Sequence, residues 1–227
     1  MRVCALIPAY NEAARIATTI EALCARFEID DIVVMDDGST DGTADIARAA
    51  GANLVLTKRN GGKGAALAAA YAAARDRADI FLLLDADLGA SAGEAVKLLP
   101  PILLNEADMT VGLLPPDPAF AASGQSGGRG FVVRLARWGI QRRTGQIFQQ
   151  PLSGQRALRR EVLEALGGTF ASGFGVEVDL TIRTIHAGFR VQEVETSFRH
   201  HVTGGDWASI RHRARQFRDV ARVVFSG

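Results

Sequence analysis

The stretch Ile80–Asp87 reads IFLLLDAD, five apolar residues followed by two aspartates one residue apart. An apolar run of this length is typical of a strand buried on both faces of a parallel sheet. Because side chains at i and i+2 of an extended chain point the same way, Asp85 and Asp87 are expected to converge on one small object. Two carboxylates at the end of a strand suit a hard divalent cation, and they also suit a helix N-cap (Asp87 or Ser91) with a solvated turn.

Before this stretch, strand and helix patterns alternate along the chain. The expected strands are Val3–Ile7, Asp31–Met35 and Asn53–Lys58, and the expected helices run from an Asn11 cap to Phe27, up to Ala50, and from the Asn60–Gly64 turn to Arg77. Short connections between such elements predict right-handed crossovers and a parallel sheet. Because parallel strands end at the same edge, the loops after these strands are expected to meet Asp85 and Asp87 there.

The pattern after Asp87 is less regular. It predicts a helix over Ser91–Leu99 broken at Pro100-Pro101, a strand at Asp108–Gly112, a long loop over 115–130, a basic helix at Phe131–Arg143, a strand at Ser153–Leu158, helices at Glu161–Leu166 and Val176–Ala187, and a strand at Phe189–Glu195. A last helix is indicated by an apolar seam at helical spacing, formed by Trp207, Ile210, Ala214, Phe217, Ala221 and Val224. Arginines lie off that seam, so this helix either covers the sheet or meets a membrane surface or a phosphorylated ligand.

Composition predicts one packed α/β domain. The chain has 227 residues, of which 48% are hydrophobic and 22% charged, and its net charge of +1 gives no support to nucleic-acid binding. Cys4 and Cys24 are expected at core positions of a reduced protein without a disulfide framework. The apolar run after Met1 is too short for a signal peptide, and no window approaches the roughly 18 apolar residues of a membrane span. We therefore expect a soluble or peripheral protein of the cytoplasm.

Three loops at the expected sheet edge concentrate carboxylates. They are Pro8–Glu12 (PAYNE), Asp36–Ser39 (DDGS) and Asp85–Asp87 (DAD). Each alone is consistent with turn and cap chemistry. Together they gather like charges that need a cation or the hydrogen-bond donors of a ligand.

Four motifs, in this order and spacing, resemble family 2 glycosyltransferases of the GT-A fold. They are IPAYNE (Ile7–Glu12), DDGSTDGT (Asp36–Thr43), NGGKGA (Asn60–Ala65) and DAD (Asp85–Asp87). The chain is similar to the type that includes dolichyl- or polyprenyl-phosphate sugar synthases and glucosyl-3-phosphoglycerate synthases. The resemblance implies a Rossmann-like, mostly parallel central sheet flanked by helices, within a single domain over residues 1–227. It implies a nucleotide-sugar-binding half at 1–112 and an acceptor-binding half at 113–227 that ends in the amphipathic helix.

The resemblance also implies an activity and donor-side roles. The activity is the transfer of a sugar from a nucleotide sugar, with a UDP-sugar as the expected donor and Mg²⁺ or Mn²⁺ as cofactor. Donor-binding roles fall on Pro8, Tyr10 and Glu12 of the first loop, on Asp37 at the base edge of the nucleotide, on Lys63 at the nucleoside or its phosphates, and on Asp85, Ala86 and Asp87 at the metal–diphosphate group.

On the acceptor side the resemblance is looser. It assigns acceptor contact to Ser153, Gly154 and Arg156, where the guanidinium suits a phosphate or carboxylate; the alternative is a solvated arginine. Glu177 and Asp179 are candidates for the catalytic base. Residues two apart on a helix differ by about 200°, so both cannot face one crevice. Glu177 is preferred for contact with sugar or acceptor, and Asp179 is held as the alternative base.

His200 resembles the third metal ligand of some family members, with His201 as the alternative. The acceptor is expected to be a polyprenyl phosphate or a small phosphorylated or carboxylated molecule. Peripheral membrane contact and a homodimer are further expectations, and nucleic acid is not an expected partner.

Three other classes compete with this interpretation. A sugar-1-phosphate nucleotidyltransferase shares the sheet and metal carboxylates, but it has a glycine- and arginine-rich first loop where this chain has PAYNE. A phospho-accepting receiver domain leaves the second half of the chain unexplained. A non-catalytic sugar-nucleotide-binding protein is disfavoured by the presence of Asp85, Asp87 and Glu177.

Overall fold

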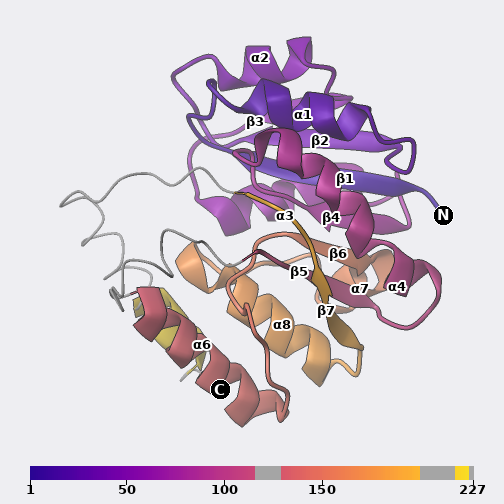
Figure 1. The fold of residues 1–227 in the computed structure, drawn as a ribbon. Helices are drawn as coiled ribbons and strands as arrows, with labels where there is room; N and C mark the ends of the chain where they lie inside the picture. Colours follow the sequence, from indigo (N-terminus) through magenta and orange to yellow (C-terminus); the bar gives the residue numbers. More distant parts are fainter. Residues whose placement is uncertain (116–128, 200–217, 225–227) are drawn as a thin grey trace.

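The computed structural model describes residues 1–115, 129–199 and 218–224 (Figure 1). The strands are β1 (Val3–Ala9), β2 (Asp31–Asp36), β3 (Leu54–Thr57), β4 (Ile80–Leu83), β5 (Met109–Leu113), β6 (Arg156–Arg159) and β7 (Val191–Glu195). The helical elements are α1 (Ile16–Cys24), α2 (Thr43–Ala49), α3 (Lys63–Ala74), η1 (Gly89–Leu98), α4 (Pro100–Leu103), α6 (Arg129–Thr144), α7 (Arg160–Ala165), η2 (Gly173–Gly175), α8 (Val176–His186) and residues 218–224.

Within the described residues the strands form one seven-stranded sheet in the order β3-β2-β1-β4-β6-β5-β7. All pairings are parallel except those of β6, which runs antiparallel to both β4 and β5. The expected mostly parallel α/β sheet is therefore confirmed.

Alternation along β1 divides the core into two layers. Val3, Ala5 and Ile7 pack on one face of the sheet with apolar residues of α1 and η1. Cys4 and Leu6 pack on the other face with residues of α3, α7 and α8. A third apolar cluster lies between α6, α8 and residues 218–224, which places α6 outside α8 (Figure 1).

Two of three local expectations are wrong. Asn11 does not cap α1, because it has a positive φ of 54° and the helix begins only at Ile16. The segment expected as an α-helix from Ser91 is the 3₁₀ helix η1. The expected break is present, because η1 ends at Leu98 before Pro100-Pro101, and Pro100 begins α4 at the position where a missing N–H costs nothing.

The two cysteines differ in burial. Cys4 is buried, and burial raises the pKa of its thiol to about 12. Cys24, which was expected in the core, is exposed at the end of α1. Both are free thiols, as expected.

None of the helices in the described part of the chain combines the length and the apolar character needed to cross a bilayer.

The strand directions determine which loops meet. β1, β2 and β4 are parallel, so the residues that follow them lie at one edge of the sheet. Because β6 is antiparallel to β4 and Arg156 pairs with Leu83, the residues that precede β6 reach this same edge. One reversed strand thus brings Ser153–Gln155 to the end of β4.

Candidate active site

The first two loops at this edge are joined by hydrogen bonds. The Asn11 side-chain oxygen accepts from the backbone N–H of Thr40 at 2.9 Å, and the Asn11 N–H donates to the Ser39 hydroxyl at 2.9 Å. The Glu12 N–H donates to the Thr43 hydroxyl at 2.9 Å. The loop after β1 therefore has a fixed position on the loop after β2.

The predicted donor-binding residues of the first loop differ in exposure. Pro8 lies within β1, paired with Met35. Tyr10 is exposed, with 51% of its surface accessible. Glu12 forms an ion pair with Arg15 at 2.8 Å. Contact of these residues with a nucleotide stays a prediction.

Asp37 is buried and bound mainly by backbone groups. Its carboxylate accepts from the N–H groups of Gly61 at 2.9 Å and Gly62 at 2.7 Å, and from Lys58 Nζ at 2.8 Å. Gly62 has φ of 84°, a conformation that glycine adopts without strain, and α3 begins at the next residue. Asp37 thus fixes the turn that positions Lys63. Its contact with a nucleotide base stays a prediction.

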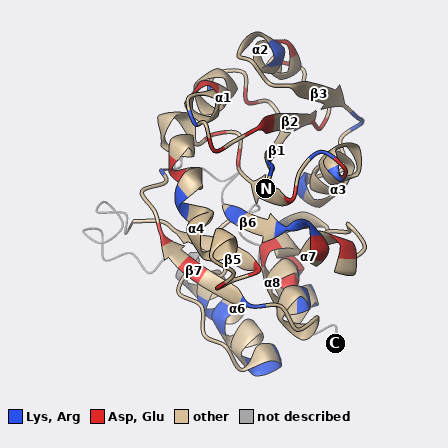
Figure 2. Cartoon of the chain, turned by 90° about the vertical axis from the view of Figure 1, so that its right-hand side faces the viewer, with Lys and Arg blue, Asp and Glu red and all other residues tan. Residues whose placement is uncertain are grey.

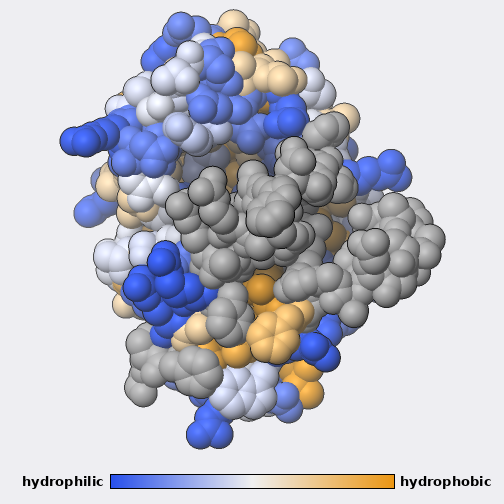
Figure 3. Space-filling view, turned by 90° about the vertical axis from the view of Figure 1, so that its left-hand side faces the viewer, coloured by the Kyte–Doolittle hydropathy of each residue, from blue (hydrophilic) through white to orange (hydrophobic). Residues whose placement is uncertain are grey.

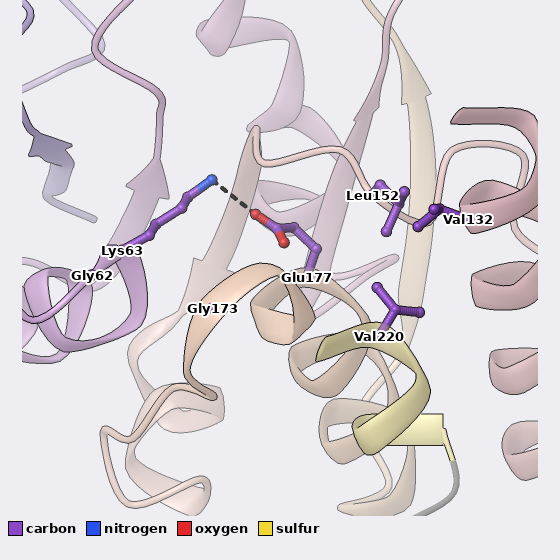
Figure 4. A pocket seen from close by; sticks show the side chains of 7 residues that line it. All are labelled: Gly62, Lys63, Val132, Leu152, Gly173, Glu177 and Val220. Carbon is purple, nitrogen blue, oxygen red and sulfur yellow. Dashed lines mark hydrogen bonds and ion pairs between the residues drawn. The ribbon is translucent and has the colours of Figure 1, made fainter. Parts of the chain in front are cut away.

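Lys63 connects the two halves of the site. Its Nζ lies 2.7 Å from Asp85 Oδ1 and 2.8 Å from Glu177 Oε1 (Figure 4). Burial lowers the pKa of the Lys63 ammonium, but the Asp85 and Glu177 carboxylates outweigh burial and leave this pKa above its ordinary value. The lysine is therefore a fixed cation between two carboxylates.

Asp85 is held from its other side by the loop before β6. Gln155 is fully buried, and its Nε2 donates to Asp85 Oδ2 at 2.7 Å. The Ser153 hydroxyl donates in turn to Gln155 Oε1 at 3.3 Å. A Cβ at Gly154 would lie 2.8 Å from Asp85 Oδ2 and 2.7 Å from Lys63 Nζ, so only glycine leaves room for the pair. Ser153 and Gly154 are therefore at the site, although their contact with an acceptor stays a prediction.

Glu177 and Asp179 face different partners, as the helical spacing predicts. α8 begins at Val176, and Glu177 points toward Lys63 (Figure 4). Asp179 forms an i,i+4 ion pair with Arg183 at 3.3 Å and does not line the cavity beside Glu177. The geometry favours Glu177 over Asp179 as the group that touches substrate.

Arg156 is buried inside the fold, with 1% of its surface accessible. Its guanidinium donates to the Ser153 carbonyl at 3.0 Å and to the Thr181 hydroxyl at 2.8 Å. Burial lowers its pKa to about 10, against the opposing effect of Glu177 and another carboxylate. The alternative of a solvated arginine is wrong. Arg156 ties the loop before β6 to α8, and this position gives no support to a direct acceptor contact.

A cavity of about 370 Å³ opens beside Glu177. It is charged at one end and apolar at the other (Figure 4). Its lining consists of Gly62, Lys63, Val132, Leu152, Gly173, Glu177 and Val220. A ligand that joins a polar group to an apolar portion matches this division.

A last feature is a close approach between α3 and the chain before α8. A Cβ at Gly64 would overlap the carbonyl oxygen of Ala171. The first turn of α3, which carries Lys63, therefore packs directly on backbone of the segment that precedes α8.

The donor set at the end of β4 fits a hard divalent ion. Asp85 and Asp87 are half-buried whereas Ala86 and Leu88 are buried, so the two aspartates are the more accessible residues of the turn that follows β4. Their oxygens are the ligands that Mg²⁺ and Mn²⁺ prefer. Among the described residues, no group of three or more His, Cys, Asp and Glu side chains is gathered as a metal site. His200 and His201 lie outside the described residues.

Sequence reasoning missed the supporting residues. Lys58 binds Asp37, and Gln155 binds Asp85. Val132, Leu152 and Val220 form the apolar side of the cavity. The spacing of Ser153 and Gln155, two apart within the expected strand Ser153–Leu158, was the available signal that both side chains point to one side.

Comparison with known proteins identifies the class. The glycosyltransferase AglJ of Haloferax volcanii is 34% identical over 212 residues, covering 90% of this chain and 65% of that protein. Undecaprenyl-phosphate mannosyltransferase of Micrococcus luteus is 28% identical over 219 residues, covering 87% of this chain and 84% of that protein. These relatives are glycosyltransferases.

Glucosyl-3-phosphoglycerate synthase of Mycobacterium tuberculosis is 32% identical over 204 residues, covering 79% of this chain and 59% of that protein. Its crystal structure with Mn²⁺, UDP and glucosyl-3-phosphoglycerate matches with a TM-score of 0.80 and 27% identity, covering 99% of this chain and 79% of that chain. The chain thus spans less than two thirds of the full length of AglJ and of this synthase. The shared architecture is the expected GT-A fold.

The model of glycosyl transferase family 2 matches residues 4–167. This protein therefore belongs to glycosyl transferase family 2.

Proposed function

We propose that this protein is a metal-dependent glycosyltransferase that moves a sugar from a UDP-sugar to a hydroxyl or phosphate group of an acceptor. The observation that carries the proposal is the Lys63 ammonium held between Asp85 and Glu177, at the sheet edge where the Asp37 turn ends. The crystal structure of the M. tuberculosis synthase with Mn²⁺, UDP and its product, and another with Mg²⁺ and UDP, support the donor and the cofactor.

On the donor side, the loop with Pro8, Tyr10 and Glu12 and the buried Asp37 would bind the nucleoside. Asp85 and Asp87, with Ala86 between them, would hold the metal, and the metal would neutralise charge on the departing diphosphate. His200 belongs to this proposal as a further ligand. The Lys63 ammonium contacts Asp85, one of these two aspartates. The lysine and the metal would therefore both neutralise negative charge on the diphosphate.

On the acceptor side, the role of Glu177 depends on the acceptor group. A hydroxyl must lose a proton as it attacks, and Glu177 is the carboxylate at the cavity that can accept it. A phosphate is already ionised at neutral pH and needs no base. With such an acceptor, Glu177 would orient Lys63 and the sugar instead of moving a proton. Asp179 remains the alternative base on sequence grounds, and its pairing with Arg183 argues against it.

The acceptor is proposed to be a polyprenyl phosphate or a small phosphorylated or carboxylated molecule. The apolar side chains of Val132, Leu152 and Val220 support an acceptor with an apolar portion, such as the lipid phosphate named for the M. luteus relative. The proposal also includes a donor half at 1–112 and an acceptor half at 113–227, with acceptor contact at Ser153 and Gly154. The proposed location is cytoplasmic, with peripheral membrane contact through the last helix. A homodimer is proposed as the assembly, and a nucleic-acid partner is not.

The direct test is a hydrolysis screen of nucleotide sugars with Mg²⁺ and with Mn²⁺, because slow donor hydrolysis reveals the donor without knowledge of the acceptor. We expect metal-dependent release of UDP from one UDP-sugar, lost in Asp85→Ala and retained in the surface control Asp45→Ala. Formation of a UDP-sugar from UTP and a sugar-1-phosphate would instead identify a nucleotidyltransferase. Metal-dependent UDP binding without any turnover would identify a non-catalytic binding protein.

A further inference from the structure

The outer side of α6 carries a stripe of alternating aromatic and cationic residues. Phe131, Arg134, Trp138 and Arg142 recur at helical spacing, and we call these four residues the α6 ridge. The opposite side of α6 is buried in the third apolar cluster, through Val132, Ala136 and Ile140. The ridge is therefore the side of α6 that faces away from the third apolar cluster and the other described elements.

The ridge residues pair with one another in an arrangement suited to an interface between water and an apolar phase. Phe131 and Trp138 expose 53% and 44% of their surfaces. The Arg134 guanidinium carbon lies 5.9 Å from the Phe131 ring centre, and that of Arg142 lies 5.7 Å from the Trp138 ring centre. Each pair combines an apolar ring with a charged group, the combination found where helices lie at the level of lipid headgroups.

Positive charge is concentrated at this place. α6 contains five arginines and no acidic residue, although the whole chain has a net charge of only +1 (Figure 2). Residues 218–224 pack closely on α6, since a Cβ at Gly139 would overlap Val224, and they add Arg218 and Arg222 against one Asp219. Hydrophobic and strongly hydrophilic residues lie side by side over the lower part of this face of the molecule (Figure 3).

We propose that the α6 ridge docks on the surface of a bilayer that contains anionic lipids. The arginines are opposite in charge to the anionic headgroups, and the aromatic rings suit the boundary between headgroups and acyl chains. A polyanion such as RNA matches only the first of these features, and the near-zero net charge of the chain does not favour it.

The docking rests on surface chemistry and does not depend on the proposed activity; it adds α6 to the membrane contact proposed above for the last helix. It has a consequence for that activity, because Val132 lies on the inner side of α6 and lines the apolar side of the cavity. An α6 docked on lipid would separate the bilayer from the cavity by one helix. An acceptor held in the bilayer would then reach the apolar side of the cavity over a short path.

The test is cosedimentation of the whole protein with vesicles of phosphatidylcholine alone and with vesicles that also contain phosphatidylglycerol. We expect binding to the anionic vesicles that weakens at high salt. The double variant R134Q/R142Q should weaken it by roughly thirtyfold, from about 1 kcal/mol per arginine near an anionic surface. The double variant F131S/W138S should also release the protein from the vesicles.

Matched controls come from the opposite part of the molecule. Phe27, which is 93% exposed, gives F27S as the control for loss of an exposed ring. Arg48 and Arg75, both exposed on other helices, give R48Q/R75Q as the control for loss of charge. Neither control should change vesicle binding. Equal binding by the ridge variants and the controls would overturn the proposal, as would a protein that binds RNA but neither kind of vesicle.

Tryptophan fluorescence gives a second readout that is independent of turnover. The chain has two tryptophans, so a Trp207→Phe variant reports on Trp138 alone. Its emission should shift to the blue with anionic vesicles, and lipids with brominated chains should quench it. An unchanged spectrum with vesicles that sediment the protein would place the contact elsewhere and overturn the assignment to the ridge. Loss of donor hydrolysis would leave this result unaffected.

Discussion

Asp37 follows β2 and Asp85 follows β4, so both lie at the same sheet edge, yet different kinds of group bind their carboxylates. The Asp37 carboxylate is bound by two backbone N–H groups and by Lys58, and 5% of its side chain is accessible. Within the described part of the chain, the side chains of Lys63 and Gln155 bind the Asp85 carboxylate, and 25% of the Asp85 side chain is accessible. Backbone donors cannot leave without unfolding the turn, whereas side chains can rotate away.

The comparison separates architecture from chemistry among residues of one type. Asp37 builds the turn that begins α3, so its loss is expected to affect stability first. Asp85 can exchange a lysine or an amide for another ligand, so its loss is expected to affect binding first. The kind of partner, backbone or side chain, and the difference in exposure together distinguish the two expected roles.

The largest effect is expected for Asp85→Ala. Loss of a carboxylate ligand should weaken Mn²⁺-dependent UDP binding by at least roughly a hundredfold, more than the loss of a group that only orients a ligand. Titration calorimetry with and without Mn²⁺ measures it, and Asp87→Ala should behave alike. Circular dichroism should show an intact fold. Unchanged affinity in both variants would contradict the metal assignment.

The second effect is on stability and concerns Asp37→Ala. It removes three hydrogen bonds that the buried carboxylate accepts from the Gly61 and Gly62 N–H groups and the Lys58 ammonium, at a cost of about 3 kcal/mol. Urea denaturation measures it. The control Asp45→Ala removes an exposed ion pair with Arg48 and should cost less than about 0.5 kcal/mol. If Asp85→Ala destabilises the fold as much as Asp37→Ala, the comparison fails.

A third, smaller effect is expected for Gln155→Leu, which keeps the side-chain volume and removes the donor to Asp85 Oδ2. A group that orients a metal ligand contributes about tenfold to metal affinity. Calorimetry should show that loss for Mn²⁺-dependent UDP binding, with metal-free UDP binding unchanged. The exposed Gln146→Leu serves as control. An affinity equal to that of the unaltered protein would mean that Lys63 alone positions Asp85.

The smallest effect concerns a carboxylate at the opposite sheet edge. Arg190 donates to Asp108 from its backbone and its guanidinium at 2.9–3.0 Å, and these bonds hold the pKa of Asp108 below its ordinary value. The stabilisation is therefore complete above the unfolded pKa of about 3.9 and is lost as the pH falls through the folded value. Because Arg190 is half exposed, we expect about 1 kcal/mol.

The measurement is the free energy of unfolding of Asp108→Asn and of the unaltered protein across acidic pH. The gap between them should be constant near neutrality and close below about pH 4. Mn²⁺-dependent UDP binding should not change, since Asp108 lies at the start of β5, away from the candidate site. A gap that persists in acid would show that the hydrogen bonds do not depend on ionisation.

The sequence was sufficient for features that arise from local periodicity. The apolar runs correctly predicted the strands of the sheet, whereas the convergence of Asp85 and Asp87 on one ligand stays a prediction. The helical angle between Glu177 and Asp179 correctly predicted different partners for the two carboxylates. These inferences needed only the geometry of one element at a time.

Features that depend on contacts between distant segments could not be predicted. The partners of Asp37 are backbone groups more than twenty positions away, and backbone groups have no signature in the sequence. The burial of Arg156 and the contact of Gln155 with Asp85 both depend on the antiparallel direction of β6, which the motif around them does not specify. Exposure of Cys24 likewise follows from where α1 ends.

The close approach at Gly64 leaves no space between the first turn of α3 and the segment before α8, the two parts that carry Lys63 and Glu177. Lys63 and Glu177 stand at hydrogen-bond distance because the adjacent backbone segments touch with nothing between them. A methyl group at position 64 would push α3 away from the segment before α8 and lengthen the distance between Lys63 and Glu177, although both charged residues would still be present. It would separate capture of the donor from delivery to the acceptor by geometry alone.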